Sequence, residues 1–240
     1  MSEKYPGGFV TLNQPVLDPA LGAATPGVWT LDQAMNAELT RSWPMYDPYY
    51  KNVVLNLHGN GTNAAQNNTF LDSSSNAFTI TRNGNTTQGS FSPYGSLWSN
   101  YFPDSGSNAS AYLTTPISGA ISTALSGASQ TREFWWYRTT AGSSNTALLR
   151  VNGGDQGTIY AAGTNLMVYS GGTNSIIVSL ATYVPYGVWT HIALTQSGST
   201  LTLWINGVSV GTTSNTISST GTTLQIGGAN DMLSCGYISN

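Results

Sequence analysis

The sequence predicts an all-β fold, an antiparallel β-sandwich, and three observations carry this prediction. From Lys51 onward, short runs of β-branched and aromatic residues alternate with Gly, Asn, Ser and Asp at the spacing of short strands and turns. The dipeptide Asn206-Gly207 separates two such runs and favours the tight turn of a hairpin. No comparable helical pattern competes in this part of the chain. We therefore expect residues 51–240 to form one sandwich.

The first fifty residues differ from the rest in composition, because they hold six of the ten prolines. Proline fixes φ and removes a backbone donor, so we expect residues 1–50 to be an extended arm that gains order along another surface. Within this arm, Thr30 is a suitable N-cap for a short helix through about Ser42, which Trp43-Pro44 ends. The arm is expected to dock through its apolar side chains, namely Val28, Trp29, Leu31, Met35, Leu39 and Trp43.

Nine strands are predicted after the arm from alternating apolar residues bounded by turn residues. They are Asn52–Leu57, Ala77–Arg82, Arg132–Thr139, Ala147–Val151, Asn165–Ser170, Ser175–Ala181, Trp189–Gln196, Thr200–Ile205 and Val208–Thr212. The two-residue turn between the last two strands fixes their register. Ile205 is expected opposite Val208 and Leu203 opposite Val210, all four on one buried face, with Trp204 on the other face.

Charged residues are scarce, and this constrains the partners of the chain. They make up 7% of the sequence, against roughly 25% in typical soluble domains. A surface of hydroxyl and amide groups is suited to close packing in an assembly. The net charge of -3 and the scattered Lys and Arg residues argue against nucleic acid as a partner. No apolar run approaches the ~18 residues of a membrane helix, so we expect no membrane insertion.

Four segments carry a resemblance to a known family. Trp189, His191 and Ala193 precede Leu201-Thr202-Leu203-Trp204-Ile205-Asn206-Gly207, and the earlier segments are Val53–Gly59 and Phe70–Asn76. Together they resemble the laminin G-like branch of the concanavalin A-like lectin/glucanase superfamily. The resemblance implies a jelly-roll sandwich over residues 51 to 240.

The end of the sequence also bears on this resemblance. In similar proteins the segment at Gly236–Asn240 enters a final strand that continues further. We therefore expect a sheet edge that needs a longer chain, or a strand from another copy, to fill it. Homotrimeric packing would supply such a strand.

A second resemblance concerns the biological setting. Pro26–Gln33 with Trp43-Pro44, and Asn67–Asp72 with Thr81–Asn85, resemble segments of virion proteins of marine bacteriophages. This implies a structural protein of the virion, in a tail fibre or as a capsid decoration, made in the host cytoplasm. Its partners would be other virion proteins and further copies of itself, and its role would be assembly and surface adhesion.

Catalysis is not expected. Glucan hydrolysis with retention requires two carboxyl groups only about 5 Å apart. The acids beyond Lys51 are isolated in sequence, namely Asp72, Asp104, Glu133, Asp155 and Asp231. A polysaccharide-degrading enzyme is therefore the third alternative, after a structural protein and a lectin.

Two histidines and one aspartate are the remaining candidates for metal or acid–base chemistry. His58 and His191 have no Cys, second His or nucleophile motif beside them, so we interpret both as core or hydrogen-bonded residues. Asp72 with neighbouring carbonyls is a sparse Ca²⁺ site, and an Asx turn is the simpler interpretation. We therefore expect no cofactor.

A lectin that binds a host cell-surface glycan for host recognition is the alternative function that the residues support. Trp135, Tyr137 and Trp204 would form an exposed aromatic face if the alternation of Phe134-Trp135-Trp136-Tyr137 sends Trp135 and Tyr137 outward. The same rings would otherwise fill the core or a subunit interface. The sequence leaves both interpretations open.

Overall fold

The structure is a computed structural model, and it describes residues 8–14, 25–30, 50–59, 68–89, 91–94, 98–103, 111–139, 145–153, 156–217, 221–228 and 236–239. The chain divides into two compact units, Met1–Val53 and Val54–Asn240. Each unit is described by itself.

The first unit contains a small antiparallel sheet that the sequence analysis did not predict. Strand β1 (Gly8–Gln14) pairs with β2 (Thr25–Thr30), so that Phe9 lies opposite Trp29 and Val10 opposite Val28. A single 3-10 turn, η1, covers Tyr50–Asn52. The predicted helix after Thr30 lies outside the described residues, as do four of the predicted docking residues, Leu31, Met35, Leu39 and Trp43.

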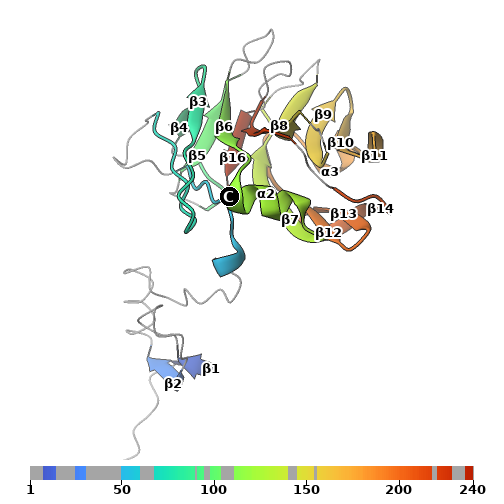
Figure 1. The fold of residues 1–240 in the computed structure, drawn as a ribbon. Coiled ribbons are helices and arrows are strands. Elements are labelled where there is room, and N and C mark those ends of the chain that lie inside the picture. The colour runs from blue at the N-terminus through green and yellow to red at the C-terminus, as the bar shows by residue number, and fades with distance from the viewer. Residues whose placement is uncertain are drawn as a thin grey trace, which may run out of the picture. The chain divides into compact units, whose positions relative to one another are not determined.

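The second unit is a sandwich of two antiparallel seven-stranded sheets (Figure 1), which confirms the predicted fold class. One sheet, here called the β8 sheet, has the order β11 (Thr173–Ser179), β10 (Asn165–Ser170), β9 (Thr158–Ala162), β8 (Thr146–Asn152), β15 (Thr223–Ile226), β6 (Tyr112–Pro116) and β3 (Thr81–Asn83). The other, the β7 sheet, has the order β14 (Val208–Thr213), β13 (Thr200–Ile205), β12 (Trp189–Ser197), β7 (Ser129–Tyr137), β16 (Gly236–Ser239), β5 (Ser99–Phe102) and β4 (Thr87–Gly89).

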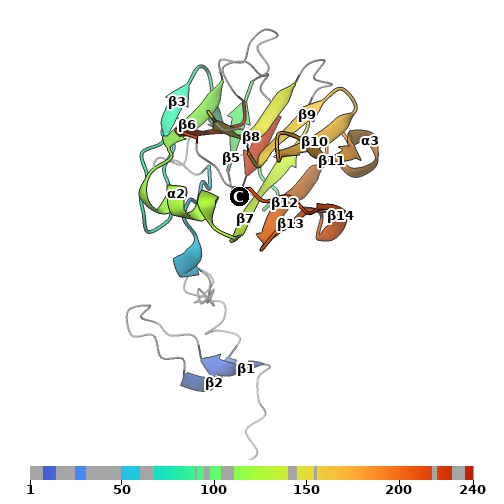
Figure 2. The same cartoon turned by 45° about the vertical axis from the view of Figure 1, so that its right-hand side comes forward.

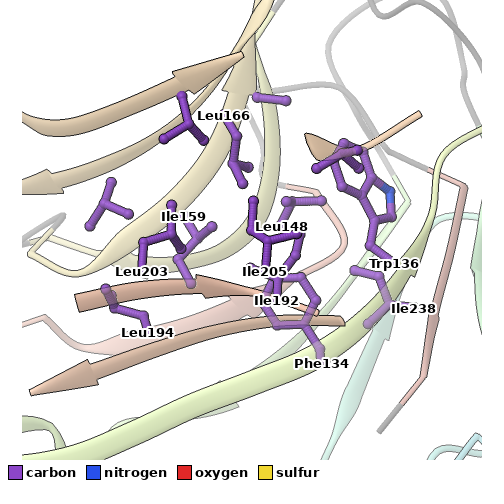
Figure 3. Packing of buried hydrophobic residues seen from close by; sticks show 14 of the residues in the cluster. Phe134, Trp136, Leu148, Ile159, Leu166, Ile192, Leu194, Leu203, Ile205 and Ile238 are labelled. Atoms are coloured by element: carbon purple, nitrogen blue, oxygen red, sulfur yellow. The ribbon is translucent and has the colours of Figure 1, made fainter. Parts of the chain in front are cut away.

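The core lies between the sheets because alternate residues of each strand point inward. From the β7 sheet, Phe134 and Trp136 meet Leu148, Ile159 and Leu166 of the β8 sheet (Figure 3). Trp136 is 2% exposed. The alternation therefore sends Phe134 and Trp136 inward and leaves the two neighbouring aromatic residues for the outer face.

Two short helices join strands. Helix α2 (Gly119–Ser126) connects β6 of one sheet to β7 of the other. Its buried residues Ile121 and Leu125 cluster with Val151 and Leu224 of the β8 sheet. Helix α3 (Leu180–Tyr183) contacts β10 and β11 (Figure 2). The sequence analysis predicted neither helix, and α3 replaces the end of the predicted strand Ser175–Ala181.

The predicted strands after residue 130 are all present, but the two earlier ones are largely wrong. Residues 53–59 form no strand, and β3 shares only two residues with the predicted strand Ala77–Arg82. Ala77 has a φ of 48°, which a regular strand excludes.

The carboxylate of Asp72 and the Ser74 hydroxyl beside it bind part of the segment 53–59. Its Oδ1 accepts hydrogen bonds from the backbone N–H groups of Asn56 and Ser74, both at 2.9 Å. Its Oδ2 accepts from the Ser74 hydroxyl at 2.8 Å and from the Phe78 N–H at 2.9 Å. The Ser74 hydroxyl also lies 2.9 Å from the carbonyl oxygen of Val54. A polar turn thus satisfies backbone groups that a sheet would otherwise satisfy.

The predicted hairpin turn is confirmed, with one change of register. Asn206 and Gly207 have φ angles of 50° and 78°, as a type I′ turn requires, and Ile205 lies opposite Val208. A bulge then places Leu203 opposite Gly211 instead of Val210. Val208 is 64% exposed, so the expectation that it is buried is wrong.

The glycine at the bulge gives a physical reason for that register. A Cβ on Gly211 would lie 2.6 Å from Cγ2 of Ile176, a residue of β11. The edge strands β14 and β11 of the two sheets meet at this point. Glycine therefore allows the sandwich to close there.

The final strand is present in the second unit. Gly236–Ser239 forms β16, which pairs with β5 on one side and with β7 on the other. Its register with β7 covers Tyr237–Ser239 opposite Tyr137–Trp135, and the expectation of a longer chain or of a strand from another copy stays a prediction.

Candidate functional site

The outer face of the β7 sheet carries a continuous row of aromatic side chains. The strand registers place Trp189 opposite Tyr137, Tyr137 opposite Tyr237, and Tyr237 opposite Tyr101. Adjacent ring centroids are 5.5, 6.1 and 4.6 Å apart. These four half-buried residues, from β12, β7, β16 and β5, are called the aromatic row.

Phe91 lies against this row. Its ring centroid is 4.6 Å from that of Tyr137, edge to face, and 5.3 Å from those of Trp189 and Tyr237. Phe91 is nevertheless 41% exposed. Burial, with the neighbouring Tyr101 and Tyr137, raises the pKa of Tyr237. The row is therefore partly covered, and the outer side of Phe91 belongs to the accessible surface.

Next to the row, Trp135 is surrounded by polar groups. Its ring centroid lies 5.2 Å from that of His191, its direct partner on β12, and 6.1 Å from that of Tyr94. His191 Nε2 lies 3.5 Å from Glu133 Oε2. These four residues, Trp135, His191, Tyr94 and Glu133, are called the Trp135 cluster.

The Trp135 cluster is accessible and polar on its outer side. The side chain of Glu133 is 53% exposed and that of His191 25% exposed, and Tyr94 is 48% exposed. Burial raises the pKa of Tyr94, a hydrogen bond with the Trp135 side chain opposes that rise, and the charge of Glu133 adds to it. An indole ring, a phenol, an imidazole and a carboxylate therefore converge on one surface.

The structure places the three predicted glycan-binding residues on this same outer face but not in one group. Tyr137 belongs to the aromatic row and Trp135 to its own cluster. Trp204 lies opposite Ala193, and its indole N–H donates to the Thr195 hydroxyl at 2.9 Å. Within the described part of the chain, no ring contact joins Trp204 to the other aromatic residues. Their role in binding stays a prediction.

Sequence reasoning missed most of this surface. Tyr101 and Tyr237 join the row only because β16 lies between β5 and β7, an order that local patterns do not reveal. Trp189 and His191 could have been found from their two-residue spacing, which puts both on one face of a strand.

Both histidines have a polar neighbour. His191 lies on the outer face of the β7 sheet, and Glu133 is its partner. His58 is exposed, and its Nε2 lies 3.0 Å from Nδ2 of Asn56. His58 is therefore hydrogen-bonded, although it does not lie on a strand.

The basic residues of the second unit lie away from the Trp135 cluster. Arg132 points into the sandwich, where it donates to the carbonyl oxygen of Gly157 at 2.8 Å and to the Gln130 side chain; burial lowers its pKa to about 10. Buried Arg138 donates to the Val184 carbonyl and the Tyr186 hydroxyl, and burial lowers its pKa. Arg82 donates to the Thr86 carbonyl. Arg150 is buried in the β8 sheet.

The structure gives Asp72 a structural role. Four N–H and O–H donors surround its two oxygens, whereas a Ca²⁺ site requires oxygen ligands that face a common point. Among the described residues, no group of three or more His, Cys, Asp or Glu side chains could hold a metal ion. The described helices include none that is long and apolar enough to cross a membrane.

A comparison with known families matches this architecture. The family model described as "Concanavalin A-like lectin/glucanases superfamily" matches residues 104–237, which is more than half of the chain. No protein with a curated description matches the sequence significantly.

Solved structures share the fold at low sequence identity. The binding domain of botulinum neurotoxin DC in complex with SialylT superposes with a TM-score of 0.55 at 14% identity, over 78% of this chain and 47% of that chain. The serotype D ligand binding domain in complex with N-acetylneuraminic acid gives 0.54 at 11% identity, over 79% and 48%. The serotype D/C VPI 5993 binding domain gives 0.57 at 13% identity, over 79% and 49%. The present chain thus spans about half the length of each.

Proposed function

The chain belongs to the concanavalin A-like lectin/glucanase superfamily, and from this premise we propose that its second unit binds a glycan on the outer face of the β7 sheet. The observation that carries the proposal is the Trp135 cluster, in which a half-buried indole ring lies beside a phenol, an imidazole and a carboxylate. A sugar ring presents apolar C–H groups on its faces and hydroxyl groups at its edge. Such a ligand requires an aromatic platform with a few polar groups around it.

The similar folds in the binding domains of botulinum neurotoxins, two of them in complexes with SialylT or N-acetylneuraminic acid, support a sugar ligand in general terms. Because the sequence identities are only 11–14%, this support comes from the shared fold and not from shared residues. The residues of the Trp135 cluster therefore carry the proposal for this chain.

The binding site is proposed to hold its ligand without cleaving it. Asp72 and Glu133 are the acids beyond Lys51 in the described part of the chain, and the oxygens of Asp72 already accept four hydrogen bonds. No second described carboxyl group lies beside Glu133 to serve as a nucleophile or general base.

The second part of the proposal is that the chain is a structural protein of a bacteriophage virion, in which the first unit attaches the sandwich to other virion proteins. The separate compact unit Met1–Val53 and the charged fraction of 7% support an assembly role. Homo-oligomers, trimers included, belong to this proposal. Particles assembled with a chain that lacks residues 1–50 should lack the sandwich, and normal incorporation of that chain would contradict the attachment role.

Glycan binding is tested with the full chain on a glycan array, followed by titration calorimetry with the best ligand. Trp135→Ala should weaken binding by about tenfold or more, because a stacking platform contributes on the order of 1 kcal/mol beyond its buried area. Trp135→Phe should keep part of the affinity. Tyr160→Ala, in β9 of the β8 sheet, is the matched control and should bind like the wild type. Wild-type affinity in a folded Trp135→Ala variant would refute this location of the site.

A further inference from the structure

We propose that this face selects uncharged glycans over acidic ones and that Glu133 sets the preference. The inference rests on the proposed function, because it concerns the ligand of the same face. Glu133 lies on β7 two residues before Trp135, so the two side chains point to the same side of the sheet, roughly 7 Å apart along the strand. One monosaccharide can span that distance.

The neighbours of Glu133 leave its carboxylate accessible to a ligand. Its direct partner on β12 is Ala193, whose methyl group does not cover it, and its side chain remains 53% exposed. His191 at 3.5 Å and Tyr94 are the polar side chains of the cluster. The carboxylate therefore stands at the edge of the Trp135 ring, where the hydroxyl groups of a stacked sugar would lie.

No guanidinium or ammonium group of the second unit offsets this negative charge. All four of its basic residues are described: Arg132, Arg138 and Arg82 donate to carbonyl oxygens of Gly157, Val184 and Thr86. Arg150 is buried in the β8 sheet. His191 is the basic side chain that contacts Glu133.

The chemistry of a carboxylate at this position favours one class of glycan. Its two oxygens only accept hydrogen bonds when ionised, and two adjacent hydroxyl groups of a neutral sugar can donate to them together. A glycan carboxylate brought to within 4–6 Å would meet a like charge with no compensating cation. At a partly exposed site that repulsion corresponds to a factor of roughly ten in affinity.

The experiment compares one neutral oligosaccharide with its sialylated form. Calorimetry on the full chain at pH 8 gives the dissociation constant of each saccharide. The wild type should bind the neutral form about tenfold more tightly. Glu133→Gln should reduce this ratio at least fivefold, by weakening neutral binding and strengthening acidic binding. Glu133→Asp keeps the charge and should keep the preference.

Ionic strength provides a readout that a structural role of Glu133 would not produce. Raising the salt concentration should shrink the preference in the wild type, because the repulsion is screened, and should leave Glu133→Gln unchanged. An equal or tighter affinity of the wild type for the sialylated form, or a ratio that Glu133→Gln does not alter, would overturn the inference while leaving glycan binding intact. Failure of both saccharides and of all other glycans to bind would overturn the proposed function and this inference with it.

Discussion

Asp72→Ala is expected to lower the free energy of unfolding by about 3–5 kcal/mol, because three backbone N–H groups and one hydroxyl lose their acceptor at once. The N–H groups belong to Asn56, Ser74 and Phe78. Each buried donor left without a partner costs about 1–3 kcal/mol, and water that enters the space offsets part of the sum. Urea denaturation of the full chain measures the change.

Asp72→Asn is the matched control for this prediction. It keeps the size of the side chain and one carbonyl oxygen, so it should cost clearly less than Asp72→Ala. Ca²⁺ or a chelator should leave the melting temperature of the wild type unchanged, because the carboxylate acts as a hydrogen-bond acceptor. A rise in stability with Ca²⁺ that Asp72→Ala abolishes would contradict the structural role.

Gly227→Ala is expected to destabilise the second unit by about 3 kcal/mol or more. A Cβ at this position would lie 2.2 Å from two ring atoms of Phe102, which is fully buried, and the φ of 79° disfavours any residue with a side chain. The ring cannot move aside without displacing the core. Urea denaturation again supplies the measurement.

Gly163→Ala separates the two causes of this loss. Gly163 also has a positive φ, 56°, but an added Cβ there would meet nothing within 4 Å. This variant should lower the free energy of unfolding only by the cost of a positive φ in a residue with a side chain, about 1 kcal/mol. Equal losses for the two variants would show that the close approach to Phe102 does not contribute.

The sequence predicted the sandwich well where strands are long and hydrogen-bond to neighbours in the chain. The meander β12, β13 and β14 follows from alternation and the Asn206-Gly207 turn, because both signals are local. The short strands β4, β5, β6, β9, β15 and β16 have 3–5 residues each and were missed. Of these, β15 and β16 pair with strands far away along the chain, as Ile238 opposite Asn100 illustrates. A local pattern carries no information about such pairs.

The candidate site was predictable only in part, because its residues come together from distant parts of the chain. Alternation along one strand correctly separates Trp135 and Tyr137 from Phe134 and Trp136. Their neighbours come from distant parts of the sequence: Tyr94 contacts Trp135, and Tyr237 contacts Tyr137. Tyr101 joins the row through Tyr237. The hydrogen bond from the Asn56 N–H to Asp72, 16 residues further along the chain, is likewise tertiary, and local strand propensity does not reveal it.

The central claim, that the outer face of the β7 sheet binds glycan, is tested most directly by nuclear magnetic resonance of the indole N–H groups during titration with the best array ligand. Trp135 and Trp136 are adjacent in sequence but point to opposite faces of the same strand. We expect the Trp135 signal to shift progressively to saturation, while the signal of Trp136, which is 2% exposed in the core, moves little. Saturable binding that leaves the Trp135 signal in place would contradict this claim.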